Sequence, residues 1–312
     1  MSLASPRTAT PTPEGPGLTT TVPKEYVHRA SLAEVFLTGW ARQSATRFSL
    51  CGQWPRAHTF FQAADGSSHD PLLAAETFRQ AGLLLAHTEL GVPLGHHFIM
   101  WDLAFTTRPD HLHIGPAPTD IELSAVCTDI VFQAGKASRF RMELSIHRDN
   151  TTIATGNGRF TCISPGVYQR LRPHRPSPSS PARRPDTTLP PATVGRTRPT
   201  DVVLTPTQHP DHWLLTPDPD HPVLFDHHGD HHPGMVLLEA ARQAATALTH
   251  PHTITPTTLT TTFHHYAELN DDCIITATPT TPPHQNHTTI HITGHQNNQP
   301  IFTTHLTTTH PT

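Results

Sequence analysis

Residues 231–245 read HHPGMVLLEAARQAA, and residues 69–83 read HDPLLAAETFRQAGL. An offset of 163 positions aligns the two stretches. The coinciding pairs are Glu76 with Glu239, Arg79 with Arg242, Gln80 with Gln243, and His69 with His232. A match of this length and spacing indicates a duplicated domain, and a glutamate placed three residues before an arginine in both copies indicates a shared site.

Both stretches predict a long helix. In the first, over residues 71–90, Asp70 can cap the helix, Pro71 occupies its first turn, and Gly91 ends it. The second helix is expected over residues 233–250. Its apolar residues lie on every side, which is typical of a buried helix.

Segments of alternating and β-branched residues accompany each helix, most of them after it, and predict an antiparallel sheet. In the first half they are 98–107, 119–132, 138–149 and 151–164. In the second half they are 202–208, 212–217, 257–269, 273–281, 287–295 and 300–309. Shorter strands are expected within 28–55. A long helix with successive strands predicts an α+β layout, with the helix packed on the sheet.

Composition divides the 312 residues into four parts. Residues 1–26 are polar and rich in Pro and Thr, which predicts a disordered tail without a secretory signal. Residues 27–165 and 201–312 are the two repeats. Residues 166–200 are rich in Pro, Arg and Ser and predict a linker whose arginines keep it soluble.

The remaining composition excludes several classes of protein. A net charge of −4, without a run of Lys or Arg, argues against binding to nucleic acid or to a membrane surface. Four scattered cysteines lack metal-ligand spacing and predict free thiols in a cytoplasmic protein. We expect no metal and no cofactor.

The helix pattern places Glu239 and Arg242 on one face of a buried helix, where charges are costly unless they are paired. The simpler interpretation is a structural ion pair between packed elements, and duplication would preserve such a pair too. The functional interpretation is a carboxylate and a guanidinium within an active site.

The loop before the second helix supports the functional interpretation. A Pro-Gly step at a helix start leaves free backbone N–H groups, here at Gly234, which can stabilise the oxyanion formed when a thioester is attacked. His227 and His232 belong to the same loop. A metal site in HHGDHH is the alternative, but no second cluster completes a coordination shell.

Four stretches resemble the A-factor biosynthesis (AfsA-type) family: WPRAHTFF, HDPLLAAETFRQAG and GVPLGHHFIMWDLAF in the first half, and HPVLFDHHGDHHPGMVLLEAARQAA in the second. The resemblance covers roughly residues 27–165 and 200–275. It implies a tandem hotdog fold, in which a sheet wraps each long helix. It also implies a β-ketoacyl transfer from acyl-carrier protein to dihydroxyacetone phosphate, the first step towards γ-butyrolactone signals.

The resemblance further assigns site residues. It implies that Glu239, Arg242 and Glu76 are catalytic, with Glu239 as a general base whose pKa is raised by burial. The residues expected to bind substrate are Arg79, His227, His232 and Gly234. One departure is His265, where the family is expected to carry an arginine.

Two other functions remain open at this level. A hydrolase or dehydratase acting on thioesters could use the same fold and glutamate. A non-catalytic regulator that binds an acyl chain or a lactone is the third hypothesis, although no DNA-binding helix or basic stripe accompanies it. The sequence also leaves oligomerisation open.

Overall fold

The computed structural model describes residues 18–173, 187–227, 229–280 and 287–309. In the first half the elements are η1 (Lys24–Val27), η2 (Leu32–Glu34), β1 (Leu37–Arg42), β2 (Arg47–Trp54), α1 (Leu72–Thr88), β3 (His97–Thr107), η3 (Pro109–His111), β4 (Thr119–Gln133), β5 (Lys136–Arg148) and β6 (Thr151–Ile163). The short helix α2 (Pro165–Leu171) follows. In the second half they are η4 (Pro191–Val194), η5 (Pro199–Asp201), β7 (Leu204–Pro206), β8 (His212–Leu215), α3 (Gly234–Thr249), β9 (Thr255–Phe263), β10 (Ile274–Pro279), β11 (His287–Gln296) and β12 (Gln299–Thr309).

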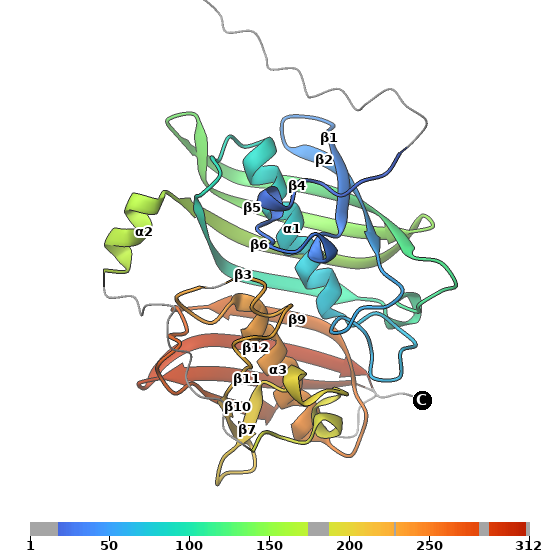
Figure 1. Cartoon of the computed structure of the whole chain (residues 1–312), viewed down its shortest axis with the longest axis vertical. Coiled ribbons are helices and arrows are strands. Elements are labelled where there is room, and N and C mark those ends of the chain that lie inside the picture. Colours follow the sequence, from blue (N-terminus) through green and yellow to red (C-terminus); the bar gives the residue numbers. More distant parts are fainter. Residues whose placement is uncertain (1–17, 174–186, 228, 281–286, 310–312) are drawn as a thin grey trace, which may run out of the picture.

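The described strands form one 12-stranded antiparallel sheet in the order β1-β2-β4-β5-β6-β3-β9-β12-β11-β10-β8-β7. Its two halves meet where β3 pairs with β9, with Leu103 opposite Thr261 and Phe105 opposite Leu259. From that junction outward, each half arranges its own strands in the same succession. The predicted α+β class is therefore confirmed, the repeated strand order agrees with a duplication, and Figure 1 shows one long helix against each half of the sheet.

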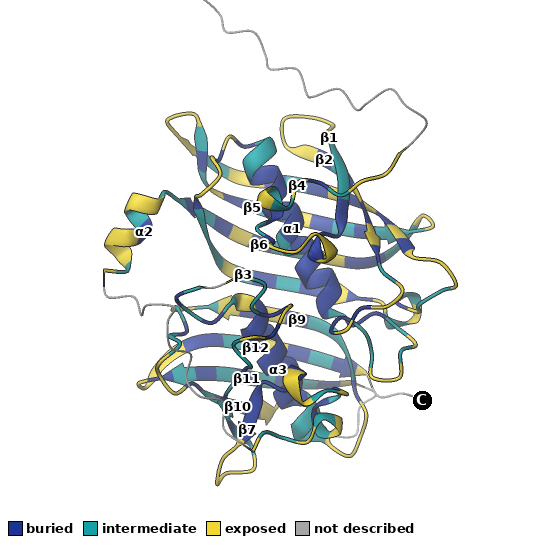
Figure 2. Ribbon diagram, viewed as in Figure 1, coloured by how far each residue is buried: buried dark blue, intermediate teal, exposed yellow. Residues whose placement is uncertain are grey.

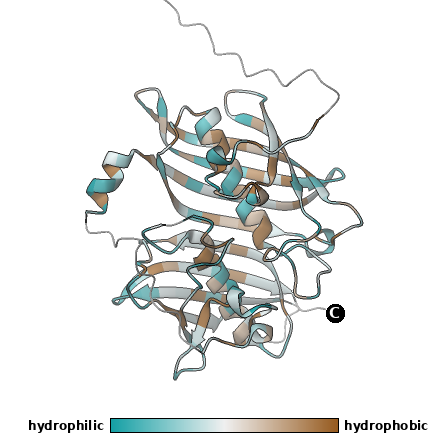
Figure 3. Ribbon diagram, viewed as in Figure 1, coloured by the Kyte–Doolittle hydropathy of each residue, from teal (hydrophilic) through white to brown (hydrophobic). Residues whose placement is uncertain are grey.

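Both long helices are buried, as expected from their apolar residues (Figures 2 and 3). α1 begins at Leu72, one residue later than predicted, and the Asp70 carboxylate accepts the Leu72 N–H at 2.9 Å. Its end is set by Gly91, whose φ of 72° lets the chain turn back so that the Leu90 and Val92 amides bond the last turn of the helix. Among the described residues, no helix combines the length and apolarity needed to cross a bilayer.

The helix and sheet approach closely beneath α1. A side chain at Gly82 would place its Cβ 2.6 Å from the Phe160 ring, so only glycine lets that ring pack on the helix. Phe160 in turn stacks against Phe78 and Phe140, with centroids 6.0 and 4.9 Å away. This packing fixes the position of α1 over the sheet and with it the position of Glu76.

Two sequence predictions about the chain outside the repeats need correction. Residues 1–17 and 174–186 lie outside the described residues. Val22, within the predicted tail, is buried and donates its N–H to Leu37 O at 2.9 Å. Arg196, within the predicted linker, is 4% exposed. The prediction that such arginines keep a linker soluble is wrong for Arg196, because its guanidinium is an internal ion-pair partner.

Candidate active site

Glu76 lies on α1 without any exposure to solvent and accepts hydrogen bonds from three side chains. Arg79 donates from Nε to Oε2 at 2.9 Å and from Nη2 to Oε1 at 2.8 Å. Arg29 donates from Nε at 3.0 Å, and Gln80 from Nε2 at 2.7 Å. Burial alone would raise the pKa of Glu76, but the two guanidiniums outweigh it and lower the pKa to about 2.

Glu239 on α3 has the same surroundings. Arg196 bonds both carboxylate oxygens at 2.8 and 2.6 Å, and Arg242 bonds both at 2.9 and 2.7 Å. Gln243 adds a bond of 2.5 Å. Burial is again opposed by the arginines, which lower the pKa of Glu239 to about 2. The predicted upward pKa shift is therefore wrong, because the sequence analysis assigned this carboxylate only one arginine.

Arg29 and Arg196 are the partners that the sequence analysis missed. Each follows a valine by two positions, in Val27-His28-Arg29 and Val194-Gly195-Arg196, and this short repeat was the available signal. Arg79 and Arg242 donate to the carbonyls of those valines, both at 3.1 Å. The repeated motif thus completes a cluster of two arginines, a glutamine and a glutamate in each half.

Both clusters lie at the boundary between the halves. Arg196 of the second half donates from Nη1 to the Phe60 carbonyl of the first half at 2.6 Å. Arg29 of the first half reaches the Val223 carbonyl of the second half at 3.4 Å. Each cluster therefore faces the loop that precedes the helix of the opposite half.

A cavity of about 520 Å³ opens beside the Glu76 cluster, and we call it the main cavity. Its polar wall contains Arg29 and Arg79. Its apolar wall continues along the two helices from that point, with Leu83 on α1 and Leu237 and Leu238 on α3. Aromatic and further apolar side chains of the sheet complete it, namely Phe98, Met100, Leu103, Phe160 and Phe263.

Four of the predicted site residues, Arg79, His227, His232 and Gly234, line the main cavity, and Glu76 lies directly behind Arg79. Glu239 and Arg242 are not among the lining residues and belong to the cluster of the other half. The start of α3 at Gly234 thus lies in the same cavity as Arg29 and Arg79, the two arginines that bind Glu76. This is because the loop before each long helix contacts the opposite half.

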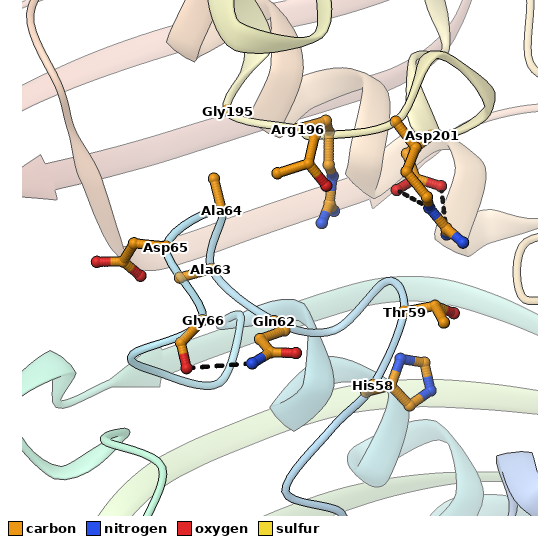
Figure 4. A pocket seen from close by; sticks show the side chains of 12 residues that line it. His58, Thr59, Gln62, Ala63, Ala64, Asp65, Gly66, Gly195, Arg196 and Asp201 are labelled. Carbon is orange, nitrogen blue, oxygen red and sulfur yellow. Dashed lines mark hydrogen bonds and ion pairs between the residues drawn. The ribbon is translucent and has the colours of Figure 1, made fainter.

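A second pocket of about 390 Å³ lies beside Arg196 and is shown in Figure 4. It differs from the main cavity at equivalent positions. Gly195 stands where the main cavity has His28, and Ala64 where it has His227. Pro71, which has no N–H, takes the place of Gly234 at the helix start. Arg196 lies 3.2 Å from the Asp70 carboxylate, whereas its counterpart Arg29 lies 4.0 Å from the Asp226 carboxylate.

Unpaired polar atoms accompany the main cavity. Within the described part of the chain, His96 Nδ1, His232 Nδ1 and the Tyr266 hydroxyl are buried without a hydrogen-bond partner, and all three residues line this cavity. Burial and the neighbouring His231 lower the pKa of His232 to about 4, so its ring is neutral. Buried polar atoms normally have partners, so this group indicates a polar ligand.

The helix α2 and the residue after it hold the cavity loop in place. Arg172 bonds both oxygens of Glu268 at 2.6 and 2.8 Å and lies 3.3 Å from the Asp230 carboxylate. Tyr168 donates its hydroxyl to Asp230 at 2.7 Å. Asp230 lies between His227 and His232, so these contacts fix the loop that carries both histidines. No group of three His, Cys, Asp or Glu side chains suited to a metal occurs in the described ranges, and His228 lies outside them.

Comparisons with known proteins agree with this architecture. Similarity to solved structures extends to a protein described as an oleoyl thioesterase from Lactobacillus plantarum, with a TM-score of 0.53 at 9% identity over 86% of this chain and 98% of that one. A 12:0-ACP thioesterase from Umbellularia californica gives a TM-score of 0.51 at 7% identity, covering 87% and 100%. At such identities the likeness shows a shared hotdog fold only.

Sequence relatives are much closer. A 2-oxo-3-(phosphooxy)propyl 3-oxoalkanoate synthase of Streptomyces virginiae is 47% identical over 285 residues, covering 91% of this chain and 96% of that protein. A synthase of the same name from Streptomyces coelicolor is 39% identical and covers 91% and 90%. A family model described as the A-factor biosynthesis hotdog domain matches residues 11–164 and 178–311. The chain therefore belongs to the A-factor biosynthesis hotdog (AfsA) family.

Proposed function

We propose that this protein transfers a 3-oxoacyl group from a thioester to the hydroxyl of dihydroxyacetone phosphate, in the main cavity. The product named for its relatives is the corresponding ester, a 2-oxo-3-(phosphooxy)propyl 3-oxoalkanoate. The observation that carries the proposal is one cavity combining two guanidiniums, a helix N-terminus and an apolar wall. The guanidiniums suit a phosphate, the helix N-terminus suits a thioester carbonyl, and the apolar wall suits an acyl chain.

The acceptor phosphate is assigned to Arg79 and His227. The Arg79 side chain is 21% exposed, and its Nη1 has no hydrogen-bond partner within the described ranges. The His227 side chain is 59% exposed and lines the same cavity. A guanidinium with a free edge binds a phosphate through short, charge-assisted hydrogen bonds. Glu76 keeps Arg79 in this position.

The thioester carbonyl is assigned to the start of α3. The Gly234 and Met235 amides have no backbone acceptor among the described residues, and both residues line the cavity. Free amides at a helix N-terminus stabilise the negative charge that develops on a carbonyl oxygen under attack. Leu237 and Leu238 follow on the same helix, where an acyl chain would lie.

The donor is assigned as the β-ketoacyl thioester of acyl-carrier protein, as the family resemblance implies. Cytoplasmic location is part of the same proposal, since this donor and dihydroxyacetone phosphate are metabolites of the cell interior. Glu239 and Arg242 are assigned to holding α3 against the other half. His265, at the expected arginine position, lines the cavity with Nδ1 2.8 Å from the Pro300 carbonyl.

The test is incubation of the purified protein with β-ketoacyl thioesters of several chain lengths and dihydroxyacetone phosphate, followed by mass spectrometry. A phosphorylated ester is expected. Free β-keto acid or an enoyl thioester in its place would identify the hydrolase or dehydratase. Folded protein that binds acyl chains without any turnover would identify the regulator.

Arg79→Gln is expected to raise the KM for dihydroxyacetone phosphate, because it removes the charge assigned to the phosphate. Arg139→Gln is the matched control, since Arg139 is exposed on β5 and does not line the main cavity. An unchanged KM in folded Arg79→Gln would contradict the assignment of the phosphate.

A further inference from the structure

His28 lines the main cavity and has no role in the binding of phosphate, thioester carbonyl or acyl chain. It follows η1 and precedes Arg29, so it lies beside the Glu76 cluster. Its ring packs edge-to-face on Phe98, with the centroids 5.3 Å apart. Its Nε2 lies 2.9 Å from Nε2 of His87 on α1. These two contacts fix the plane of the His28 ring.

The hydrogen bonds of His87 determine which nitrogen of His28 is free. His87 Nδ1 lies 2.8 Å from the Val92 carbonyl, which can only accept, so Nδ1 carries the hydrogen. In a neutral ring Nε2 then holds a lone pair and accepts from His28 Nε2. His28 Nδ1 consequently has a lone pair, and no described residue is placed to hydrogen-bond it.

The duplicated half shows what the backbone alone requires at this position. Gly195 follows η4 as His28 follows η1, and both residues are left-handed, with φ of 66° and 51°. Glycine adopts this conformation without strain, whereas a residue with a side chain adopts it at a cost. The first half therefore has an imidazole at a backbone position that favours glycine. The second half, whose pocket differs, has glycine at this position.

We propose that His28 is the catalytic base of the acyl transfer, with His87 as the residue that positions it. The proposal rests on the proposed function. The Nδ1 lone pair takes the proton of the acceptor hydroxyl as its oxygen forms a bond to the thioester carbon. The C–S bond then breaks, and the proton passes from Nδ1 to the departing sulfur, which leaves as a thiol.

The electrostatics of the free site keep this base unprotonated. Burial lowers the pKa of His28 to about 3, with contributions from His87 and Arg79, so its ring is neutral at pH 7. A phosphate dianion entering the cavity favours the imidazolium and therefore raises this pKa. The base thus becomes stronger when the acceptor is bound.

The decisive variant is His28→Gly, which installs the residue of the second half. Glycine suits the left-handed backbone, so the fold is expected to persist, as checked by thermal unfolding. The kcat is expected to fall on the order of 10²- to 10⁴-fold, as for loss of a general base, with the KM for dihydroxyacetone phosphate nearly unchanged. Added imidazole is expected to restore part of the kcat.

Two further variants control this experiment. His87→Phe keeps a ring but removes the acceptor nitrogen, so we expect roughly a tenfold or larger loss of kcat that imidazole does not restore. Asp149→Gly makes the same type of change in the exposed β5–β6 turn, where φ is 49°, and is expected to retain full activity.

The outcomes separate the two proposals. Ester formation by His28→Gly at the wild-type rate overturns the role of His28 and leaves the proposed function intact. A folded His28→Gly that fails through a raised KM, without imidazole rescue, likewise overturns it in favour of a binding role. A wild-type protein that makes no ester overturns the proposed function and the base with it.

Discussion

Each buried glutamate is ionised because two guanidiniums and a glutamine amide replace the water it has lost. Removing one partner of such a group leaves unpaired charge in the interior, at a cost of about 3–5 kcal/mol. Glu239→Gln is therefore expected to lower the free energy of unfolding by about that amount, because Arg196 and Arg242 lose their common counter-ion. Urea unfolding measures it.

Glu143→Gln, on the exposed face of β5, is the matched control and is expected to change stability by less than about 0.5 kcal/mol. A Glu239→Gln protein as stable as the control would show that the arginines do not depend on this carboxylate.

The same carboxylates predict how stability depends on pH. Their folded pKa values, about 2, lie below the ordinary value of 4.5, so the unfolded chain takes up protons first as pH falls. The stability they contribute is fully present above about pH 4.5 and is lost as pH falls towards 2. Denaturant midpoints measured across this range should decline, and Glu239→Gln should reduce the slope of that decline.

At the level of residues, the sequence singled out both buried glutamates but not their full set of hydrogen-bond partners. The correspondence between Glu76 and Glu239 could be detected because each lies in a helix with a strong apolar sequence pattern. Arg29 and Arg196 lie in three-residue repeats within irregular segments, where no period marks which side chains turn inward. Pairing across the two halves is a property of the assembled fold, so His227 and Gly234 were assigned to Glu239, whereas they share a cavity with Arg79.

Among the elements, the short helix α2 positions a loop of the second half. Arg172, the residue just after α2, forms ion pairs with Asp230 and Glu268 of that half. Arg172→Gln is expected to loosen the loop that carries His227, His232 and Gly234. Hydrogen exchange of the amides of His227, His232 and Gly234 should become faster, and kcat should fall. Arg170→Gln, on the exposed face of α2, is the control and should change neither.

The long helices and most strands could be predicted because burial imposes a period on their residues. The predicted helices at 71–90 and 233–250 correspond to α1 and α3, and the Thr-rich segments near the C-terminus are strands as expected. Sequence reasoning missed α2 and the short 3-10 helices, of which η4 lies within the predicted linker. The residues of α2, PGVYQRL, are too few to show a period, and the Pro-rich stretch after them has the composition of a linker.

At the scale of the whole molecule, the two halves share one fold, but their pockets carry different side chains at equivalent positions. The main cavity has His28 and His227 where the second pocket has Gly195 and Ala64, and the helix start that lines the main cavity has an amide at Gly234 where α1 has Pro71. Both halves retain the buried glutamate cluster, because that cluster joins them. A duplicated scaffold can thus keep its structural charges in both copies and its ligand groups in one.

This divergence predicts one acceptor site per chain. Titration calorimetry with dihydroxyacetone phosphate should give a stoichiometry of one, because Arg242, the counterpart of Arg79, does not line the second pocket. His227→Ala, which copies Ala64, should weaken that binding roughly tenfold or more, as expected for loss of a hydrogen bond to a charged group. Ala64→Ser, in the second pocket, should leave the Kd unchanged. Two equivalent sites per chain, or equal effects of the two variants, would mean that both pockets bind the acceptor.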